Sequence, residues 1–254
     1  MLSVRERHKL ILDELTQKGF IRVQDLADSL GVTGATLRSD LRILESQHLL
    51  QRNHGSAFPI KQKVIDLPVQ EKSTIRASEK KRIALAAMQL ICEDDSIIMT
   101  SGTTIEALAQ NMNGKGSLNI VTPSIRVGVF LSEHRDINIL MLGGQLIKNS
   151  LSVRDSYTLD GLKNVACSKL FFSCDGFDLE AGVTTAFVEE ARMTNAMMNA
   201  ASQIILLADS SKCGKVGFGK ICDFSRINIL ITDKGIVPDI KKQIESIGVK
   251  VIAV

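Results

Sequence analysis

Arg38 and Arg42 are the residues of this chain best placed to recognise DNA. They are four residues apart, so on a helix both guanidinium groups point the same way. Leu37, Leu41 and Leu44 recur at spacings of four and three, which places them together on an apolar face. Arginine pairs bidentately with guanine edges in the major groove. The stretch predicts a DNA-reading helix; an ordinary surface helix with solvated charges is the alternative.

A helix-turn-helix pattern surrounds these arginines. The sequence predicts helices over residues 3–18, 25–30 and within 32–45, an extended step at 20–23, a turn at 31–33 and a hairpin with its turn at 53–56. Thr33 can cap the third helix through its hydroxyl. The hairpin is typical of the wing of a winged helix, which would bring Arg52 and His54 near the phosphate backbone. The predicted DNA-contacting residues are Thr33, Ala35, Thr36, Arg38, Ser39, Arg42, Arg52 and His54.

The segment Ser101-Gly102-Thr103-Thr104 is a candidate anion site. It follows a predicted strand at 96–99 and opens a helix, so its hydroxyl and backbone N–H groups face the positive end of the helix dipole. This arrangement suits a phosphate. Thr103 and Glu106 also have the spacing of a capping box, so a well-capped helix without a ligand is the alternative.

Further polar and glycine residues follow other predicted strands. Lys212 could supply the countercharge for a phosphate, or could be a solvated loop lysine. Asp175 and Glu189 could hydrogen-bond sugar hydroxyls; the alternatives are a turn aspartate and a partner of a helix dipole. Gly143 and Gly144 could let the backbone approach a ligand or could form a plain turn.

Short apolar segments alternate with helical patterns from residue 78 onward. Predicted strands cover 96–99, 120–121, 137–142, 169–173, 203–208, 227–231 and 249–253, and predicted helices include 79–91, 186–201 and 238–247. This alternation is typical of a largely parallel sheet covered on both faces. Ligands of such sheets bind outside the carboxyl ends of the strands, where the candidate residues fall. The predicted organisation is a first domain at 1–58, a linker at 59–75 and a second domain at 76–254.

Composition narrows the choice of function. Residues 1–61 carry nine Lys and Arg against seven Asp and Glu, a net charge of +2, so DNA contact must come from a local patch. The five cysteines are odd in number and lack Cys-x-x-Cys spacing, which argues against a zinc site and favours reduced thiols in the cytoplasm. We expect no signal peptide or membrane span. The NTPase, zincin and serine-hydrolase motifs do not occur in the sequence.

With both halves in view, the chain resembles the DeoR family of bacterial sugar-operon regulators over nearly its whole length. The matching segments are 36–41, 44–45 and 52–57 in the first half, and 101–104, 143–144, 175–176, 182–185, 209–212 and 231–233 in the second. Within the family, the C-terminal half is most similar to the glucitol operon repressors.

Five positions depart from the family pattern. They are Ser39, His48, Ser56, Thr100 and Pro123, where the family usually has Arg, Gly, Gly, Asp and Asn. The first bears on DNA contact, the second and third on the turns around the wing, and the last two on ligand recognition.

The resemblance implies a winged helix-turn-helix domain joined to an α/β sensor domain, mainly a parallel sheet, similar to ribose-5-phosphate isomerase and glucosamine-6-phosphate deaminase. It implies a repressor of a sugar or polyol operon that binds double-stranded operator DNA as a homodimer or homotetramer and is released by a phosphorylated sugar. The implied effector-binding residues are Ser101, Gly102, Thr103, Thr104, Thr122, Ser124, Gly143, Gly144, Asp175, Glu189 and Lys212. We expect no catalytic residue, metal, cofactor or membrane partner.

An enzyme is the alternative. A phosphosugar isomerase or deaminase could carry the N-terminal helices as an accessory domain, with Asp175 and Glu189 as acid–base groups.

Overall fold

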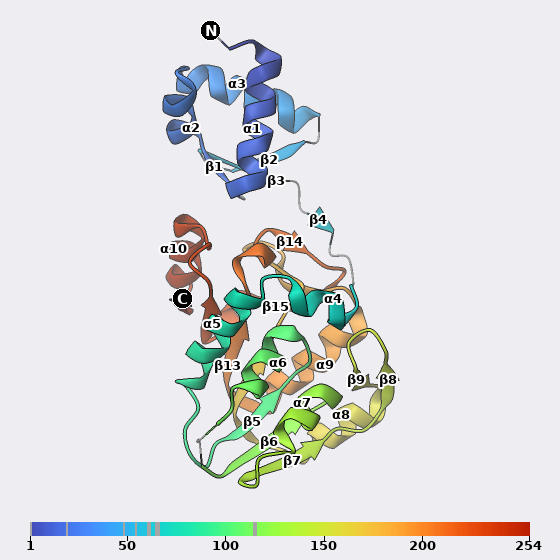
Figure 1. Ribbon diagram of the computed structural model, residues 1–254. Helices are drawn as coiled ribbons and strands as arrows, with labels where there is room; N and C mark the ends of the chain where they lie inside the picture. The colour runs from blue at the N-terminus through green and yellow to red at the C-terminus, as the bar shows by residue number, and fades with distance from the viewer. Residues whose placement is uncertain are drawn as a thin grey trace. The chain divides into compact units, whose positions relative to one another are not determined.

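The computed structural model describes residues 2–18, 20–47, 49–53, 55–59, 62–63, 67–113 and 116–254. The chain divides into two compact units, Met1–Gln62 and Lys63–Val254, whose helices and strands are labelled in Figure 1. The second unit takes in part of the segment 59–75 that the sequence analysis assigned to a linker. This segment contains a short helix, α4 (Val69–Thr74).

The first unit is a winged helix-turn-helix. Its elements are α1 (Val4–Lys18), β1 (Ile21–Arg22), α2 (Val23–Leu30), α3 (Gly34–Ser46), β2 (Leu50–Asn53) and β3 (Ser56–Pro59), and β4 (Gln62–Lys63) follows; β1, β3 and β2 form an antiparallel sheet in that order. Gly31 has the left-handed φ of 63° that ends α2 and turns the chain into α3. The helices share one core, with Ile11 from α1, Leu26 from α2 and Leu41 from α3. The predicted arrangement is confirmed, although α2 begins two residues earlier than predicted.

The second unit is built on a seven-stranded sheet in the order β17-β16-β13-β10-β5-β6-β7, and every neighbouring pair is parallel. The strands are β5 (Ser96–Met99), β6 (Leu118–Thr122), β7 (Ile137–Met141), β10 (Cys167–Phe172), β13 (Ala201–Leu207), β16 (Ile229–Thr232) and β17 (Lys250–Ala253). Each predicted strand corresponds to one of these, so the predicted parallel sheet is confirmed.

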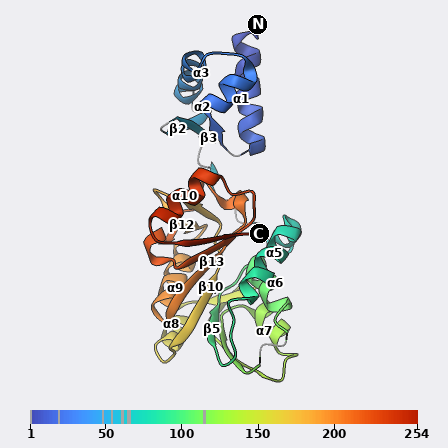
Figure 2. The ribbon, with the colours of Figure 1, turned by 90° about the vertical axis from the view of Figure 1, so that its left-hand side faces the viewer.

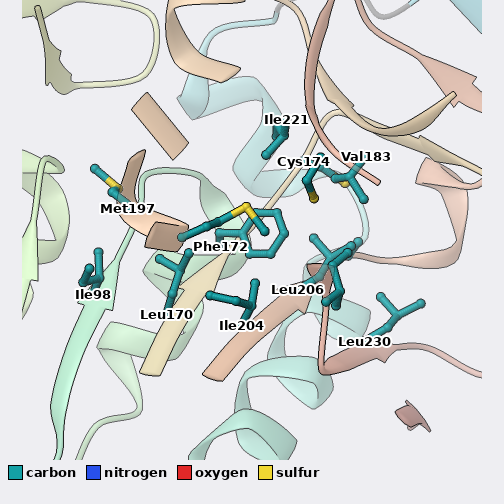
Figure 3. Packing of buried hydrophobic residues seen from close by; sticks show 14 of the residues in the cluster. Ile98, Leu170, Phe172, Cys174, Val183, Met197, Ile204, Leu206, Ile221 and Leu230 are labelled. Atoms are coloured by element: carbon teal, nitrogen blue, oxygen red, sulfur yellow. The ribbon is translucent and has the colours of Figure 1, made fainter. Parts of the chain in front are cut away.

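Helices cover both faces of this sheet (Figure 2). On one face lie α5 (Ala77–Met88), α6 (Thr103–Gln110) and α7 (Ile125–Leu131), and on the other α8 (Ser156–Leu162), α9 (Val188–Asn199) and α10 (Pro238–Ser246). Successive side chains of a strand point to opposite faces, so Leu170 and Phe172 belong to one core cluster and Phe171 to the other. Figure 3 shows Phe172 packed among Leu170, Ile204 and neighbouring apolar side chains. Burial on both faces explains why the strands are almost continuous apolar runs.

The order of the strands reverses between β5 and β10. The chain runs outward from β5 through β6 to β7, then returns to β10 and runs the other way through β13, β16 and β17. At such a switch point a crevice forms outside the carboxyl ends of the two strands. The segments that follow β5 and β10 are therefore the first place to look for a ligand site.

Short strands that the sequence analysis did not predict extend the unit beyond the main sheet. β8 (Gln145–Ile147) pairs with β9 (Ser152–Arg154), and β11 (Gly176–Asp178), β12 (Gly182–Thr185) and β15 (Gly219–Cys222) form an antiparallel sheet, with β14 (Lys215–Val216) nearby in sequence. Within the part of the chain that the structure describes, no helix combines the length and apolar character that crossing a membrane requires.

Candidate functional site

The outward face of α3 carries the predicted DNA-contacting residues. The exposed positions are Thr33, Ala35, Arg38, Ser39 and Arg42, and Thr36 is half-buried. The three leucines of the helix point the other way and are buried. The Thr33 side chain accepts a hydrogen bond from the backbone N–H of Thr36 at 3.1 Å, so the predicted N-cap is confirmed. Two guanidinium groups therefore project from a capped helix whose back is fixed in the core.

A buried ion pair holds α3 against α1. Asp40, within the apolar face of α3, accepts hydrogen bonds from Nε of Arg7 at 2.6 Å and from its Nη2 at 3.0 Å. Nε2 of His8 lies 3.2 Å from the same carboxylate. Burial alone would raise the pKa of Asp40, but the hydrogen bonds and charge of Arg7 outweigh it and lower the pKa. The ion pair fixes the helix that presents the two arginines. The position of an aspartate on the apolar face of the helix could have indicated such a pair from the sequence.

The wing is attached to the C-terminal end of α3. Arg52 of β2 donates two hydrogen bonds to Glu45, from its backbone N–H at 3.0 Å and from Nε at 2.7 Å. Both side chains remain about one-third exposed. Arg52 therefore positions the wing strand, and its remaining N–H groups can still reach a phosphate. His54, the other predicted wing contact, lies outside the described residues.

The predicted anion segment stands at the switch point. Gly102 follows β5 with φ 113° and is the N-cap of α6. A Cβ atom there would lie 2.5 Å from Oγ of Ser173, the residue after β10. Ser173 also donates a hydrogen bond to the carbonyl of Ser101 at 3.1 Å. The ends of β5 and β10 thus meet closely, and only glycine fits between the serine and the first turn of the helix.

Amino groups gather near the first turn of α6, where the charge of Glu106 acts on Lys80. Lys80 of α5 is buried and donates a hydrogen bond to the carbonyl of Lys72 in α4. Burial lowers the pKa of Lys80 to about 8; the charge of Asp209 opposes this shift, and the charge of Lys212 adds to it. Burial, with the charge of Lys212, also lowers the pKa of Lys215. The predicted phosphate ligand Lys212 is half-buried and lies within electrostatic reach of two amines that burial desolvates, Lys80 and Lys215.

Carboxylates lie close to these amines. Asp175, after β10, accepts hydrogen bonds from Nζ of Lys72 at 3.0 Å, from Oγ1 of Thr185 at 2.8 Å and from the N–H of Ala186 at 3.1 Å. Burial opposes ionisation, but the charge of Lys72 and the bond from Thr185 keep the pKa of Asp175 lowered. Its oxygens therefore accept hydrogen bonds at neutral pH, as a hydroxyl-binding group must.

Glu190, rather than the predicted Glu189, is the second carboxyl group of this cluster. Glu189 lies exposed in the first turn of α9, and its assignment as a hydroxyl-binding residue stays a prediction. Oε2 of Glu190 is 2.9 Å from Oγ1 of Thr185, whose single proton goes to Asp175 or to Glu190. Burial and then the charge of Asp175 raise the pKa of Glu190 to about 7. A protonated Glu190 donating to Thr185 satisfies all three groups.

Four further predicted effector-binding residues make local contacts in the turns where they lie. Thr122 accepts a hydrogen bond from the N–H of Ser124, and Ser124 caps α7 by accepting one from Val127 at 3.3 Å. The carbonyl of Gly143 accepts a hydrogen bond from Thr158 at 2.6 Å. A Cβ atom at Gly144 would lie 2.5 Å from that same threonine hydroxyl. Only glycine at position 144 leaves room for Thr158, whose hydroxyl takes part in the cap of α8. A role for these four residues in effector binding stays a prediction.

Comparison with known families agrees with this division of the chain. The model of the DeoR-like helix-turn-helix domain matches residues 7–63, and the model of the DeoR C-terminal sensor domain matches residues 75–234. The chain belongs to the DeoR family. The three relatives described below cover 92% to 100% of this chain, so each is similar to both units.

Three DeoR-family relatives illustrate the likeness. The uncharacterized HTH-type transcriptional regulator YulB of Bacillus subtilis is 34% identical and covers 100% of this chain and 98% of its own length. A putative aga operon transcriptional repressor of Escherichia coli O157:H7 is 34% identical, with 98% and 93% covered. A lactose phosphotransferase system repressor of Staphylococcus epidermidis is 32% identical, with 92% and 95% covered.

Among solved structures, ribose 5-phosphate isomerase A from Neisseria gonorrhoeae aligns with 53% of this chain and 52% of its own, at 18% identity and a TM-score of 0.40. A likeness of this extent does not indicate a shared activity.

Sequence reasoning missed Lys72, Lys80 and Glu190. Lys80 had a signal, because it precedes Ile83 and Ala84 on the inward face of a predicted helix, where a lysine is unusual. Lys72 had none, since α4 is a six-residue helix in a stretch without clear periodicity. Among the residues that the structure describes, no group of three His, Cys, Asp or Glu side chains is placed to hold a metal ion.

Proposed function

We propose that this DeoR-family chain represses a sugar or polyol operon in the cytoplasm and leaves its operator when a phosphorylated sugar binds the second unit. The observation that carries the proposal is the cluster of Lys80, Lys212 and Asp175 beside the start of α6. It combines amines for an anion with a carboxylate for hydroxyls at a switch point. The repressor names of the relatives from Escherichia coli and Staphylococcus epidermidis support it.

The DNA-binding step rests on α3. Arg38 and Arg42 enter the major groove, where each guanidinium can pair with a guanine edge, while Thr36 and Ser39 contact bases or phosphates. Arg52 holds the wing beside the backbone. A palindromic operator requires two copies of the helix related by a two-fold axis, so the repressor acts as a homodimer or a homotetramer.

The effector step rests on the switch point. The phosphate is held by the backbone N–H groups at the start of α6, by the hydroxyls of Ser101, Thr103 and Thr104, and by Lys212. The buried Lys80, which the charge of Glu106 in the first turn of α6 also reaches, adds a further positive charge. Asp175 accepts hydrogen bonds from the sugar hydroxyls, and no cofactor is needed for this binding.

A phosphosugar isomerase or deaminase is the second candidate. Its supporting observation is the pair of Asp175 and Glu190, because a carboxyl group with a pKa of about 7 is suited to proton transfer. A thiolate nucleophile is disfavoured, since burial raises the pKa of the Cys174 thiol and raises that of Cys213 to about 12. We expect binding without turnover.

Two measurements on the full chain test the proposal. In a thermal-shift screen against hexose 6-phosphates, pentose 5-phosphates and polyol phosphates, a ligand at a hundred times its Kd adds about 2.7 kcal/mol to stability. The same ligand should weaken binding to an operator duplex, selected from a random library, in fluorescence anisotropy. Product formation at enzyme-like rates would favour the isomerase, and a screen without any stabilising phosphate would reject the sensor role.

A further inference from the structure

Helix α4 lies close in sequence to the boundary between the two units. It is the first helix of the second unit, and only residues 63–68 separate its first residue from Gln62, where the first unit ends. A displacement of α4 would act on the short segment of chain that leads back to the DNA-binding unit. Helix α4 is therefore a route by which a ligand could influence operator binding.

Both ends of α4 are held by the second unit. At the N-terminal end, Val69 is 2% exposed and its N–H donates to the carbonyl of Asn149 at 2.8 Å. Beyond the C-terminal end, Arg76 adopts a φ of 54°, which is unfavourable for a residue with a Cβ atom. Its side chain lies 3.0 Å from Asp233 and 3.3 Å from Asp209, carboxylates that follow β16 and β13. These two ion pairs hold the strained residue in place.

The middle of α4 is held inside the candidate effector site itself. Nζ of Lys72 donates to Oδ1 of Asp175, and the backbone carbonyl of Lys72 accepts from the buried Lys80. The other oxygen of Asp175 is fixed by Thr185 and Ala186 on the second unit's own loop. Oδ1 is thus the oxygen that a ligand hydroxyl would compete for, and Lys72 is the group that it would displace.

We propose that the contact of Lys72 with Asp175 is a latch that a polyhydroxylated phosphate opens, so that effector binding is transmitted to the DNA-binding unit through α4. A ligand hydroxyl takes Oδ1 of Asp175 and displaces the ammonium group of Lys72 from it, so that α4 loses its ion pair with the end of β10. This inference rests on the proposed function and names its route of regulation. Coupling requires that the ligand favour the released form over the latched one.

The first test uses no ligand and is made on the full chain. Lys72→Met keeps the apolar stem of the side chain and removes its charge; Lys81→Met, at an exposed position of α5, is the matched control. We expect faster hydrogen–deuterium exchange over residues 69–76 and at least a threefold loss of operator affinity in Lys72→Met alone. If both variants match the parent in exchange and in operator affinity, the latch does not exist.

A second arm separates the latch from the sensor role. Parent and variants are titrated with fructose 6-phosphate, ribose 5-phosphate and glucitol 6-phosphate while operator binding is followed. If the parent responds and Lys72→Met still binds the phosphate in a thermal-shift assay but responds at least threefold less, the latch is supported. An equal response in both overturns the latch alone. Loss of phosphate binding with unchanged exchange over 69–76 makes Lys72 a simple ligand contact and also overturns it. A parent that no phosphate affects refutes the sensor role, and the exchange measurement still decides the latch.

Discussion

The two units of this chain use positive charge in opposite ways. On α3, Arg38 and Arg42 project into solvent from a helix whose back is apolar. At the strand ends of the second unit, Lys80 is buried and Lys212 is half-buried, and both lie within electrostatic reach of Asp209 or Asp175. The same charge is therefore hydrated in one unit and desolvated in the other.

This difference sets the response of each unit to solution conditions. Exposed arginines attract DNA phosphates over a Debye length of about 10 Å at 0.1 M salt, so operator binding should weaken steeply as salt rises. The buried amine of Lys80 is screened less by salt, but its pKa of about 8 lies closer to neutral pH. The DNA-binding surface should thus respond mainly to ionic strength, and the effector site mainly to pH.

The largest expected loss of stability comes from breaking the ion pair of Arg7 with Asp40, which is buried in the DNA-binding unit. Asp40→Ala leaves Arg7 buried without its carboxylate, which should cost about 3–5 kcal/mol of unfolding free energy. Thermal unfolding of the full chain measures the loss, and hydrogen–deuterium exchange over residues 4–46 assigns it to the first unit. Ser39→Ala, at the exposed neighbouring position, is the control and should change little.

The same pair has a definite pH dependence. The folded-state pKa of Asp40 is lowered, so its contribution to stability is present above the unfolded pKa of about 3.9 and is lost as the pH falls below it. An Asp40→Ala variant as stable as Ser39→Ala at pH 7 would show that the pair does not hold α3.

Arg38→Ala tests the exposed charges. Loss of a bidentate contact with a base should cost about 1–3 kcal/mol at the operator and relax the preference for one base pair. Anisotropy titrations with the operator and with random duplex measure both effects, and Arg82→Ala on the exposed side of α5 is the control. A variant that binds the two duplexes as the parent does would mean that α3 is not the reading helix.

The fold was more predictable from sequence than the effector site, for a physical reason. Apolar periodicity reports burial of a whole element, so all seven strands of the main sheet were predicted. Which polar residue reaches a ligand depends on contacts between distant segments. Glu189 and Glu190 both suit the first turn of α9, and only the packing of Thr185 against Asp175 selects the second. Lys72 reaches Asp175 across 103 positions of the chain, which no local pattern reports.

The amines of the second unit are tested by Lys212→Ala. Its side chain is half-buried, so losing its contact with a phosphate should weaken sugar-phosphate binding about tenfold, or roughly 1.4 kcal/mol. Operator affinity without ligand should stay unchanged, because Lys212 lies in the second unit. Lys234→Ala, at an exposed position after β16, is the control. An unaltered dose response to the phosphate would remove Lys212 from the site.

The smallest expected effect is a change of phosphate affinity with pH, and it distinguishes the two units most directly. Lys80 titrates at about 8, so between pH 7 and pH 9 most of its positive charge is lost, whereas a sugar phosphate is already a dianion at pH 7. Phosphate affinity should therefore fall a few-fold as the pH rises through this interval, and it should fall less in Lys80→Met, where only groups such as Glu190 still change charge. The operator contacts come from arginines, which stay charged throughout. Calorimetric titration of the phosphate, beside anisotropy of the operator at constant salt, compares the two. Equal pH dependence in parent and Lys80→Met would show that the buried amine does not face the phosphate.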